Sequence, residues 1–420
     1  MKKNTKRDRE DSRMKIIDGG VTAAEGFLAA GIAAGIKKGN SKDMAMLYSE
    51  KPCRAAGTFT KNIVKAAPVK WDQKIVYESD FAQAVVCNSG IANACTGEEG
   101  YGYCMQTAKA AGETLGIPQD AVLVASTGVI GQQLPIDTLL QGIETMKPLL
   151  SHTREAGILA AQSIMTTDTV KKEAAVQIQL SGRTVTIGGM CKGSGMIHPN
   201  MCTMLSFVTT DAAIDKKLLQ EALGEIVNDT YNMISVDGDT STNDTVLVLA
   251  NGMAGNPEIT EKNEDYETFR EALKYVNTCL AKKIAADGEG ATALFEVQVV
   301  GAQTKEQARI LAKSVITSSL TKAAIFGHDA NWGRILCAMG YSGAQFDPEK
   351  VDLFFESAGG KLQIIQDGVA VDYSEEEATK ILSEKEVTAI ADIKMGTESA
   401  AAWGCDLTYD YVKINADYRS

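Results

Sequence analysis

The chain has 420 residues, 45% of them apolar, so it is long enough for about two to four domains and for a large buried core. Its 54 acidic and 42 basic residues give a net charge of −12, which disfavours nucleic acid and anionic membranes as partners. Nine cysteines without a C-x-x-C pair and three widely spaced histidines predict free thiols, no metal site and a reducing, cytoplasmic location.

The N-terminus carries a short basic segment. Residues 1–13 are rich in Lys and Arg but precede no apolar run, so we expect a disordered N-terminal extension and not a secretory signal peptide. The longest apolar stretch, residues 26–36, is shorter than the roughly 20 residues that span a bilayer. We therefore expect a soluble protein.

Strand patterns dominate the first half of the chain. Continuous apolar runs at residues 85–86 and 121–125 predict strands that are covered on both faces. Residues 176–180 and 185–187 alternate apolar and polar side chains on either side of Ser181-Gly182. This pattern predicts a β-hairpin with one wet face.

The second half of the chain mixes helix and strand patterns. Apolar residues at helical spacing follow Asp215 and again follow Thr304, so we expect a helix after each of these N-caps. Residues 246–250 form a continuous apolar strand pattern, and residues 295–299 form an alternating one. Both halves thus predict an α/β (α+β) fold with layers of buried sheet under helices.

One segment stands apart, because a glycine-rich and then polar stretch runs directly into an apolar strand pattern. Residues 191–204 read C-K-G-S-G-M-I-H-P-N-M-C-T-M and lead into Leu205 to Val208. Ser194 lacks the G-x-S-x-G spacing of a serine-hydrolase elbow. In a phosphate-binding loop the lysine follows the glycines, whereas Lys192 precedes them, so mononucleotide binding is not supported. The simplest prediction from the residues is a loop that enters a strand near Thr203.

This segment closely resembles the self-processing site of the ornithine acetyltransferase family, also called the bifunctional glutamate N-acetyltransferase family of arginine biosynthesis. In that family a K-G-S-G-M-I-x-P-N-M-A-T-M-L run is cut before its Thr. Cys202 stands where the family usually has Ala. Further blocks similar to the family occur in family order, at residues 19–23, 56–60, 88–90, 126–131, 165–169, 237–245, 287–292, 329–334 and 414–418.

The resemblance implies a layered sandwich that cleaves itself between Cys202 and Thr203. It implies an alpha chain of residues 14–202 and a beta chain of residues 203–420 that begins with the nucleophile Thr203. Two alpha and two beta chains are expected to assemble.

The implied reaction transfers the acetyl group of N-acetylornithine to glutamate through an acetyl-Thr203 ester. No cofactor is implied, and acetyl-CoA stays open as a second acetyl donor. Thr127 and the Gly128 backbone N–H are expected to form the oxyanion hole. Substrate contacts are implied for Thr166, Lys192, Thr203, Glu289, Asn415 and Ser420. Lys192 suits the amino-acid carboxylate, and Glu289 suits the side-chain amine of ornithine.

A threonine at a new N-terminus is chemically suited to this task. Its α-amine has an ordinary pKa of about 7.7 to 8.0, close to working pH, so the amine can take the proton of its own hydroxyl. No histidine is then needed as the base.

Two alternatives remain open at this point. An N-terminal Thr nucleophile also serves a self-cleaving amidase or aminopeptidase, in which water accepts the acyl group. An uncleaved, non-enzymatic binding protein of the same fold is the second alternative, and it requires a single band on a denaturing gel.

Overall fold

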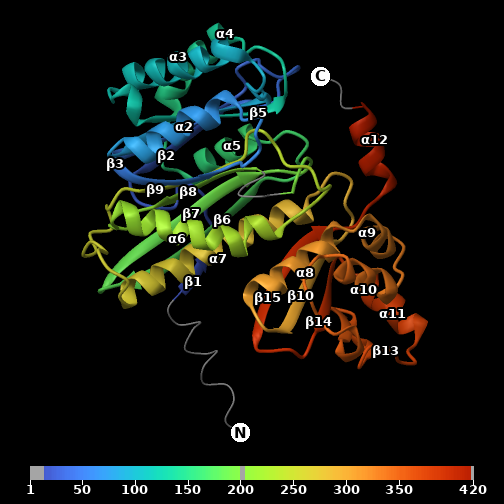
Figure 1. Ribbon diagram of the computed structural model, residues 1–420. Helices are drawn as coiled ribbons and strands as arrows, with labels where there is room; N and C mark the ends of the chain where they lie inside the picture. Colours follow the sequence, from blue (N-terminus) through green and yellow to red (C-terminus); the bar gives the residue numbers. More distant parts are fainter. Residues whose placement is uncertain (1–13, 199–203, 418–420) are drawn as a thin grey trace.

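The computed structural model describes residues 14–198 and 204–417, and two β-sheets organise it into two lobes (Figure 1). The N-terminal extension and the predicted cleavage point lie outside these residues. The first sheet has nine strands in the order β1-β6-β7-β8-β9-β3-β4-β5, with β2 also paired to β3. Its strands are β1 (Met14–Ile17), β2 (Phe27–Ile32), β3 (Met44–Phe59), β4 (Ala82–Ile91), β5 (Val122–Val129), β6 (Lys172–Leu180), β7 (Arg183–Lys192), β8 (Leu205–Thr210) and β9 (Thr245–Ala250).

Helices cover both outer faces of this first lobe. Helix α7 (Glu264–Ala286) lies over β6 and β7, and α6 (Lys216–Asp229) packs beside α7 against β3 (Figure 1). The remaining helices of this lobe are α2 (Ala67–Glu78), α3 (Gly97–Leu115), α4 (Ile136–Met146) and α5 (Arg154–Ser163), with the 3₁₀ turns η1 (Gln119–Ala121), η2 (Lys147–Leu149) and η3 (Tyr231–Met233).

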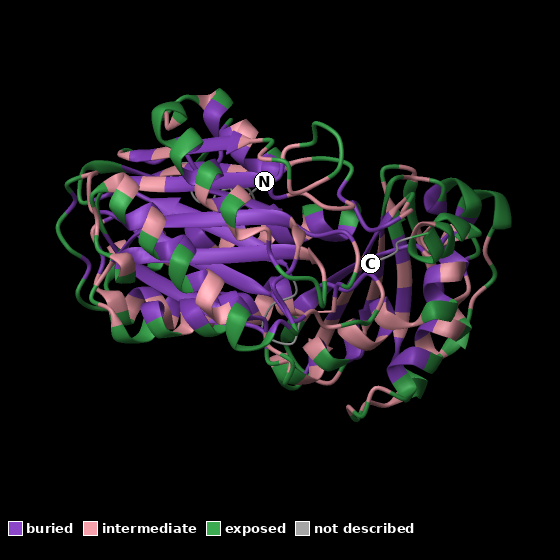
Figure 2. Ribbon diagram, turned by 90° about the horizontal axis from the view of Figure 1, so that it is seen from above, coloured by how far each residue is buried: buried purple, intermediate pink, exposed green. Residues whose placement is uncertain are grey.

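The strands of this lobe separate two apolar cores. Phe207 and Leu247 belong to the core shared with α2 to α5, whereas Val208 and Val248 face the core under α6 and α7. Successive side chains of a strand point to opposite faces, so continuous apolar runs are needed here. The strands are accordingly buried while the helices keep exposed faces (Figure 2). This arrangement confirms the expected sheets under helices.

The second lobe is built on six strands in the order β13-β12-β11-β14-β10-β15. These strands are β10 (Leu294–Ala302), β11 (Asp352–Ser357), β12 (Gly360–Gln366), β13 (Val369–Ala370), β14 (Glu386–Asp392) and β15 (Glu398–Cys405). The helical elements are α8 (Lys305–Thr317), α9 (Ser319–Phe326), α10 (Trp332–Gly340), α11 (Glu375–Leu382), α12 (Tyr409–Asp417) and η4 (Pro348–Lys350). None of the described helices is long and apolar enough to cross a bilayer.

The predicted hairpin is present, but its wet face is shorter than expected. Strands β6 and β7 pair around Ser181 and Gly182, whose φ angles of 47° and 77° fit a tight two-residue turn. Gln179 near the turn is exposed, whereas Thr186 is buried and its N–H donates to the Asp211 carboxylate at 2.7 Å. The prediction of one wet face is therefore wrong away from the turn, because other segments of the lobe cover the strands there.

Both predicted helix starts are confirmed. The Asp215 carboxylate accepts hydrogen bonds from the N–H groups of the first turn of α6. The Thr304 hydroxyl accepts one from Gln307 at the start of α8. The predicted strand from Leu205 to Val208 lies in β8, which pairs with β7. The predicted boundary between alpha and beta chains thus falls between two neighbouring strands of one sheet.

Candidate functional site

Six of the predicted site residues line one small pocket. The pocket has a volume of about 140 Å³. It is lined by Ala92, Thr127, Gly128, Ile130, Thr166, Thr167, Lys192, Gly195, Met196, Ser241, Thr242, Asn243, Glu289 and Asn415. Cys202, Thr203 and Ser420 lie outside the described residues. Segments far apart in sequence therefore meet where β5 and β7 end.

The oxyanion-hole pair predicted from the resemblance lies at the end of β5. Parallel strands β4 and β5 bring Gly90 opposite Gly128, whose φ is 131°. A Cβ at Gly128 would lie 2.4 Å from the Gly90 carbonyl oxygen, so only glycine fits at this position. The neighbouring Thr127 side chain is 9% exposed, and the Lys192 ammonium donates to its Oγ1 at 3.3 Å.

Asn243 holds this strand end in place, and no role was predicted for it. Its Nδ2 donates to the carbonyl oxygen of Ala92 at 2.5 Å and to that of Ser126 at 2.8 Å. The Thr242 hydroxyl in turn donates to Asn243 Oδ1 at 2.6 Å. The position lies in the family-like block of residues 237–245, which is the one sequence signal that could have drawn attention to it.

A buried cluster of charges lies next to the pocket, behind residues that line it. Lys172 has no exposed side-chain surface, and its Nζ lies 2.6 Å from Asp168 Oδ1 and 2.5 Å from Asp287 Oδ2. Asp168 also accepts the N–H of Thr166 at 3.0 Å and that of Gly193 at 2.7 Å. Through these hydrogen bonds and ion pairs, the cluster connects the segments that carry Thr166 and Lys192 to the segment just before Glu289.

The charges of the cluster stabilise one another. Burial alone raises the pKa of Asp168, but the positive charges of Lys192 and Lys172 outweigh burial and hold this pKa below its ordinary value. Burial lowers the pKa of Lys172, yet Asp168 and Asp287 bring it above its ordinary value. Asp168 and Lys172 are thus both charged at neutral pH.

Replacing Lys172 with methionine should destabilise the fold strongly. The substitution leaves two carboxylates buried without their shared cation, which costs about 3–5 kcal/mol of unfolding free energy. Urea denaturation measures the loss. Lys171→Met is the matched control, because Lys171 pairs with Glu173 at a partly exposed position and its loss should cost about 1 kcal/mol or less. Equal losses in the two variants would show that the cluster adds no stability.

Glu289 reaches the pocket from the second half of the chain. Its Oε2 accepts a hydrogen bond from Asn415 Nδ2 at 2.8 Å, so α12 contributes directly to the pocket wall. Its N–H donates to the Ser194 carbonyl oxygen at 3.0 Å. A Cβ at Gly195 would lie 2.3 Å from the Glu289 carboxylate, and glycine there lets the carboxylate approach the loop. Helix α12 extends from the second lobe toward the end of β5 (Figure 1).

The loop that leads to the predicted cleavage point is fixed in place. The Asp237 carboxylate accepts the N–H groups of Met196 at 2.6 Å and Ile197 at 2.8 Å. His198 Nδ1 lies 3.1 Å from Ser235 Oγ, and burial lowers the pKa of His198 to about 4. His198 is therefore neutral at working pH and bound within the structure.

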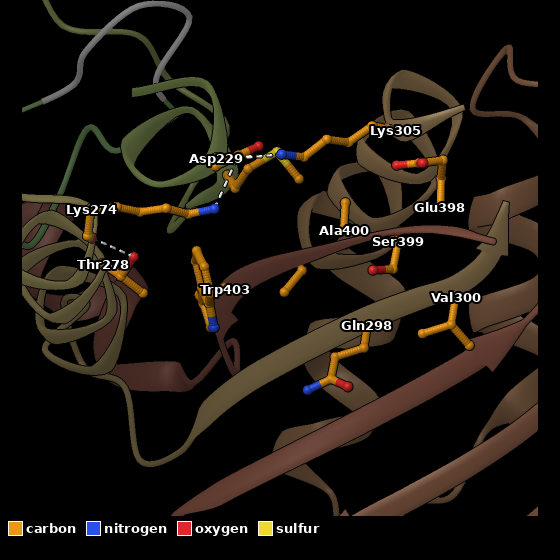
Figure 3. A pocket seen from close by; sticks show the side chains of 12 residues that line it. Asp229, Lys274, Thr278, Gln298, Val300, Lys305, Glu398, Ser399, Ala400 and Trp403 are labelled. Atoms are coloured by element: carbon orange, nitrogen blue, oxygen red, sulfur yellow. Dashed lines mark hydrogen bonds and ion pairs between the residues drawn. The ribbon is translucent and has the colours of Figure 1, made fainter. Parts of the chain in front are cut away.

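A larger cavity of about 460 Å³ lies between the two lobes (Figure 3). Lys274 and Lys305 both reach toward Asp229 there, at 3.1 Å and 2.5 Å, and Trp403 forms part of the wall. The charged groups pair with each other, and none of the predicted site residues lines this cavity. The predicted site residues that the structure describes thus line the smaller pocket and not this cavity.

Known proteins resemble the chain over almost its whole length. The "Arginine biosynthesis bifunctional protein ArgJ" of Symbiobacterium thermophilum is 55% identical over 409 residues, which cover 97% of this chain and 100% of that protein. "Arginine biosynthesis bifunctional protein ArgJ 1" of Clostridium acetobutylicum is 54% identical and covers 95% of this chain and 97% of its own length.

Solved structures also match. The crystal structure of the arginine biosynthesis bifunctional protein ArgJ from Bacillus halodurans is 49% identical with a TM-score of 0.49, and the match covers 51% of this chain and 100% of that chain. The ArgJ family model matches residues 28–420. This match and the identities to relatives confirm the family resemblance found in residues 191–204, and the chain belongs to the ArgJ family.

Proposed function

We propose that the chain transfers the acetyl group of N-acetylornithine to glutamate in arginine biosynthesis. The observation that carries the proposal is the single pocket in which Thr127, Gly128, Lys192 and Glu289 meet. It offers hydroxyl and backbone donors for an oxyanion together with one cation and one anion for an amino-acid substrate. The names of full-length relatives, arginine biosynthesis bifunctional proteins, support this assignment.

The nucleophile in this proposal is Thr203. The next residue in the chain, Met204, is buried, and its carbonyl oxygen accepts the Thr245 N–H at 2.8 Å. Leu205 pairs with Lys192 across β7 and β8. The described chain thus resumes one residue after Thr203, beside the strand end that carries Lys192, and this supports the choice of Thr203 as the nucleophile.

Maturation is proposed to create this nucleophile. Thr203 Oγ attacks the Cys202 carbonyl carbon, the peptide C–N bond breaks, and the nitrogen takes up the hydroxyl proton. Water then hydrolyses the ester, which leaves a carboxylate on Cys202 and a free hydroxyl and α-amine on Thr203. The products are chains of 202 and 218 residues, before any trimming of the N-terminus. Ile197 and Met204, on either side of this bond, are both hydrogen-bonded to the rest of the first lobe, and this supports the proposal.

Acetyl transfer then uses the same hydroxyl. Thr203 Oγ attacks the acetyl carbonyl of N-acetylornithine, and the negative charge on oxygen is stabilised by the Thr127 hydroxyl and the Gly128 N–H. The Thr203 α-amine takes the hydroxyl proton and passes it to the departing ornithine nitrogen. Glutamate reverses these steps and leaves as N-acetylglutamate. The exchange replaces one amide by another and needs no ATP.

Substrate recognition is proposed to depend on opposite charges. Lys192 binds the α-carboxylate that N-acetylornithine and glutamate share, and Glu289 binds the side-chain amine of ornithine. Thr166, Asn415 and Ser420 supply further polar contacts, with Asn415 already bound to Glu289.

The proposed scheme predicts ping-pong kinetics. A single nucleophile that carries the acetyl group must release ornithine before glutamate enters, so double-reciprocal plots should give parallel lines. Activity should fall as pH drops below the pKa of the Thr203 α-amine, ordinarily about 7.7 to 8.0, because the protonated amine cannot act as the base. Intersecting lines would indicate direct transfer in a ternary complex.

An acetyl-transfer assay with glutamate as acceptor tests the function itself. N-acetylornithine and acetyl-CoA are supplied separately as donors, and the rate of N-acetylglutamate formation is measured. Formation of N-acetylglutamate with acetyl-CoA alone would identify acetyl-CoA as a second donor. Release of free acetate without N-acetylglutamate would instead support the amidase alternative.

The proposal includes an assembly of two alpha and two beta chains in the cytoplasm. It rests on the family resemblance. Light scattering on purified protein measures the assembly, and a mass equal to one alpha and one beta chain would contradict it.

A further inference from the structure

The contact between Lys192 and Thr127 fixes which atom donates. An ammonium group has three donors and no acceptor, so in the 3.3 Å contact the Thr127 oxygen accepts from Lys192 Nζ. Within residues 14–198 and 204–417 the Thr127 hydroxyl has no second partner. Its own proton is therefore left for a group that enters the pocket.

Lys192 is buried and its backbone neighbour is anchored. The side chain is 7% exposed and belongs to the last residue of β7. The next residue, Gly193, donates its N–H to Asp168 at 2.7 Å, and the Lys192 charge is the strongest of the influences that lower the pKa of Asp168. Asp168 thus anchors the backbone beside Lys192 and also balances its charge.

We propose that Lys192 is a positioning residue of the oxyanion hole. It donates to Thr127 Oγ1 and thereby turns the Thr127 proton toward the oxyanion that forms on the acetyl group. A donor that is already oriented needs no reorganisation during the reaction, which is the property that makes such sites effective. The inference rests on the proposed function. It gives Lys192 a second role besides its contact with the substrate carboxylate, and this second role should affect even a substrate that has no carboxylate.

A substrate without a carboxylate separates the two roles. 4-Nitrophenyl acetate is an acetyl ester that can acylate Thr203 and has no carboxylate for Lys192 to bind. The variants Lys192→Met, Thr127→Val and the double variant are compared with the wild type in their cleaved forms. The first-turnover release of nitrophenolate is measured, together with acetylation of the beta chain.

The expected loss for Lys192→Met with this ester is at least about tenfold, and no larger than the loss for Thr127→Val. The acylation rate of the double variant should lie within about threefold of the rate of Thr127→Val. If both residues act through one hydroxyl, the effects of the two substitutions do not add. Unchanged acylation by the ester, with a raised KM for N-acetylornithine, would overturn the proposal and leave Lys192 as a carboxylate contact alone.

Two further variants keep the result interpretable. Lys192→Gln retains an N–H donor and should recover part of the lost rate, and it replaces Lys192→Met if that variant does not mature. Lys216→Met is the matched control. Lys216 is the first residue of α6, its ammonium donates to the carbonyl oxygen of Ser79 at the end of α2, and it is not among the residues that line the pocket. Its acylation rate should stay within about twofold of the wild type.

The outcomes distinguish this inference from the proposed function. Wild-type protein that is acetylated by the ester but passes nothing to glutamate would contradict the proposed function, while the variants still test Lys192. Wild-type protein that the ester never acetylates would overturn both the nucleophile and the role of Lys192.

Discussion

Thr203→Ala is expected to leave the protein as one chain of 420 residues without acetyl-transfer activity. Alanine has no hydroxyl to attack the Cys202 carbonyl, so neither the peptide cleavage nor the acetyl ester can form. A denaturing gel and N-terminal sequencing measure the cleavage, and the wild type should give two bands, the second beginning at Thr203.

Thr203→Ser is the matched control for this result. Serine retains the hydroxyl, so the variant should still cleave and should keep measurable activity. A wild-type protein that is active yet intact would contradict the proposed maturation. It would also favour a nucleophile elsewhere in the pocket.

Thr127→Val is expected to slow acetyl transfer by about 10²-fold or more. Valine has nearly the same shape as threonine but cannot donate a hydrogen bond to the oxyanion, and loss of one such donor typically costs about 10²–10³ in kcat. KM for N-acetylornithine should change little, because the donor acts mainly in the transition state. Steady-state kinetics on the cleaved protein measure both constants.

The conservative change at the same position serves as the control. Thr127→Ser retains the donor and should keep most of the activity, while both variants should unfold at nearly the wild-type temperature. A loss that lies in KM with kcat unchanged would remove Thr127 from the oxyanion hole and make it a substrate contact.

The fold features that depend on neighbouring residues could be predicted from the sequence. The turn at Ser181 and Gly182 needs two residues that tolerate positive φ, and the caps at Asp215 and Thr304 need only an oxygen beside the first N–H groups of a helix. The pairing of β4 with β5 could not be predicted in this way, because periodicity does not specify which strands become neighbours.

The same difference between local and distant contacts explains which parts of the candidate site could be predicted from the sequence. The family resemblance identified Thr127, Lys192 and Glu289, and the structure brings them to one pocket. The buried cluster around Lys172 was not predicted. Lys172 is flanked by Lys171 and Glu173, and such a run of charged residues has the sequence pattern of an exposed strand end. Its burial depends on a carboxylate 115 residues later in the chain, which no local pattern reveals.

The intact masses of the two chains after incubation with N-acetylornithine alone test the account most directly. With no glutamate to accept it, the acetyl group should remain on the enzyme and increase the mass of the Thr203-containing chain by one acetyl group. Addition of glutamate should restore the original mass and yield N-acetylglutamate. An unmodified beta chain under conditions that support full turnover, or an acetyl group found on the alpha chain, would contradict Thr203 as the covalent carrier.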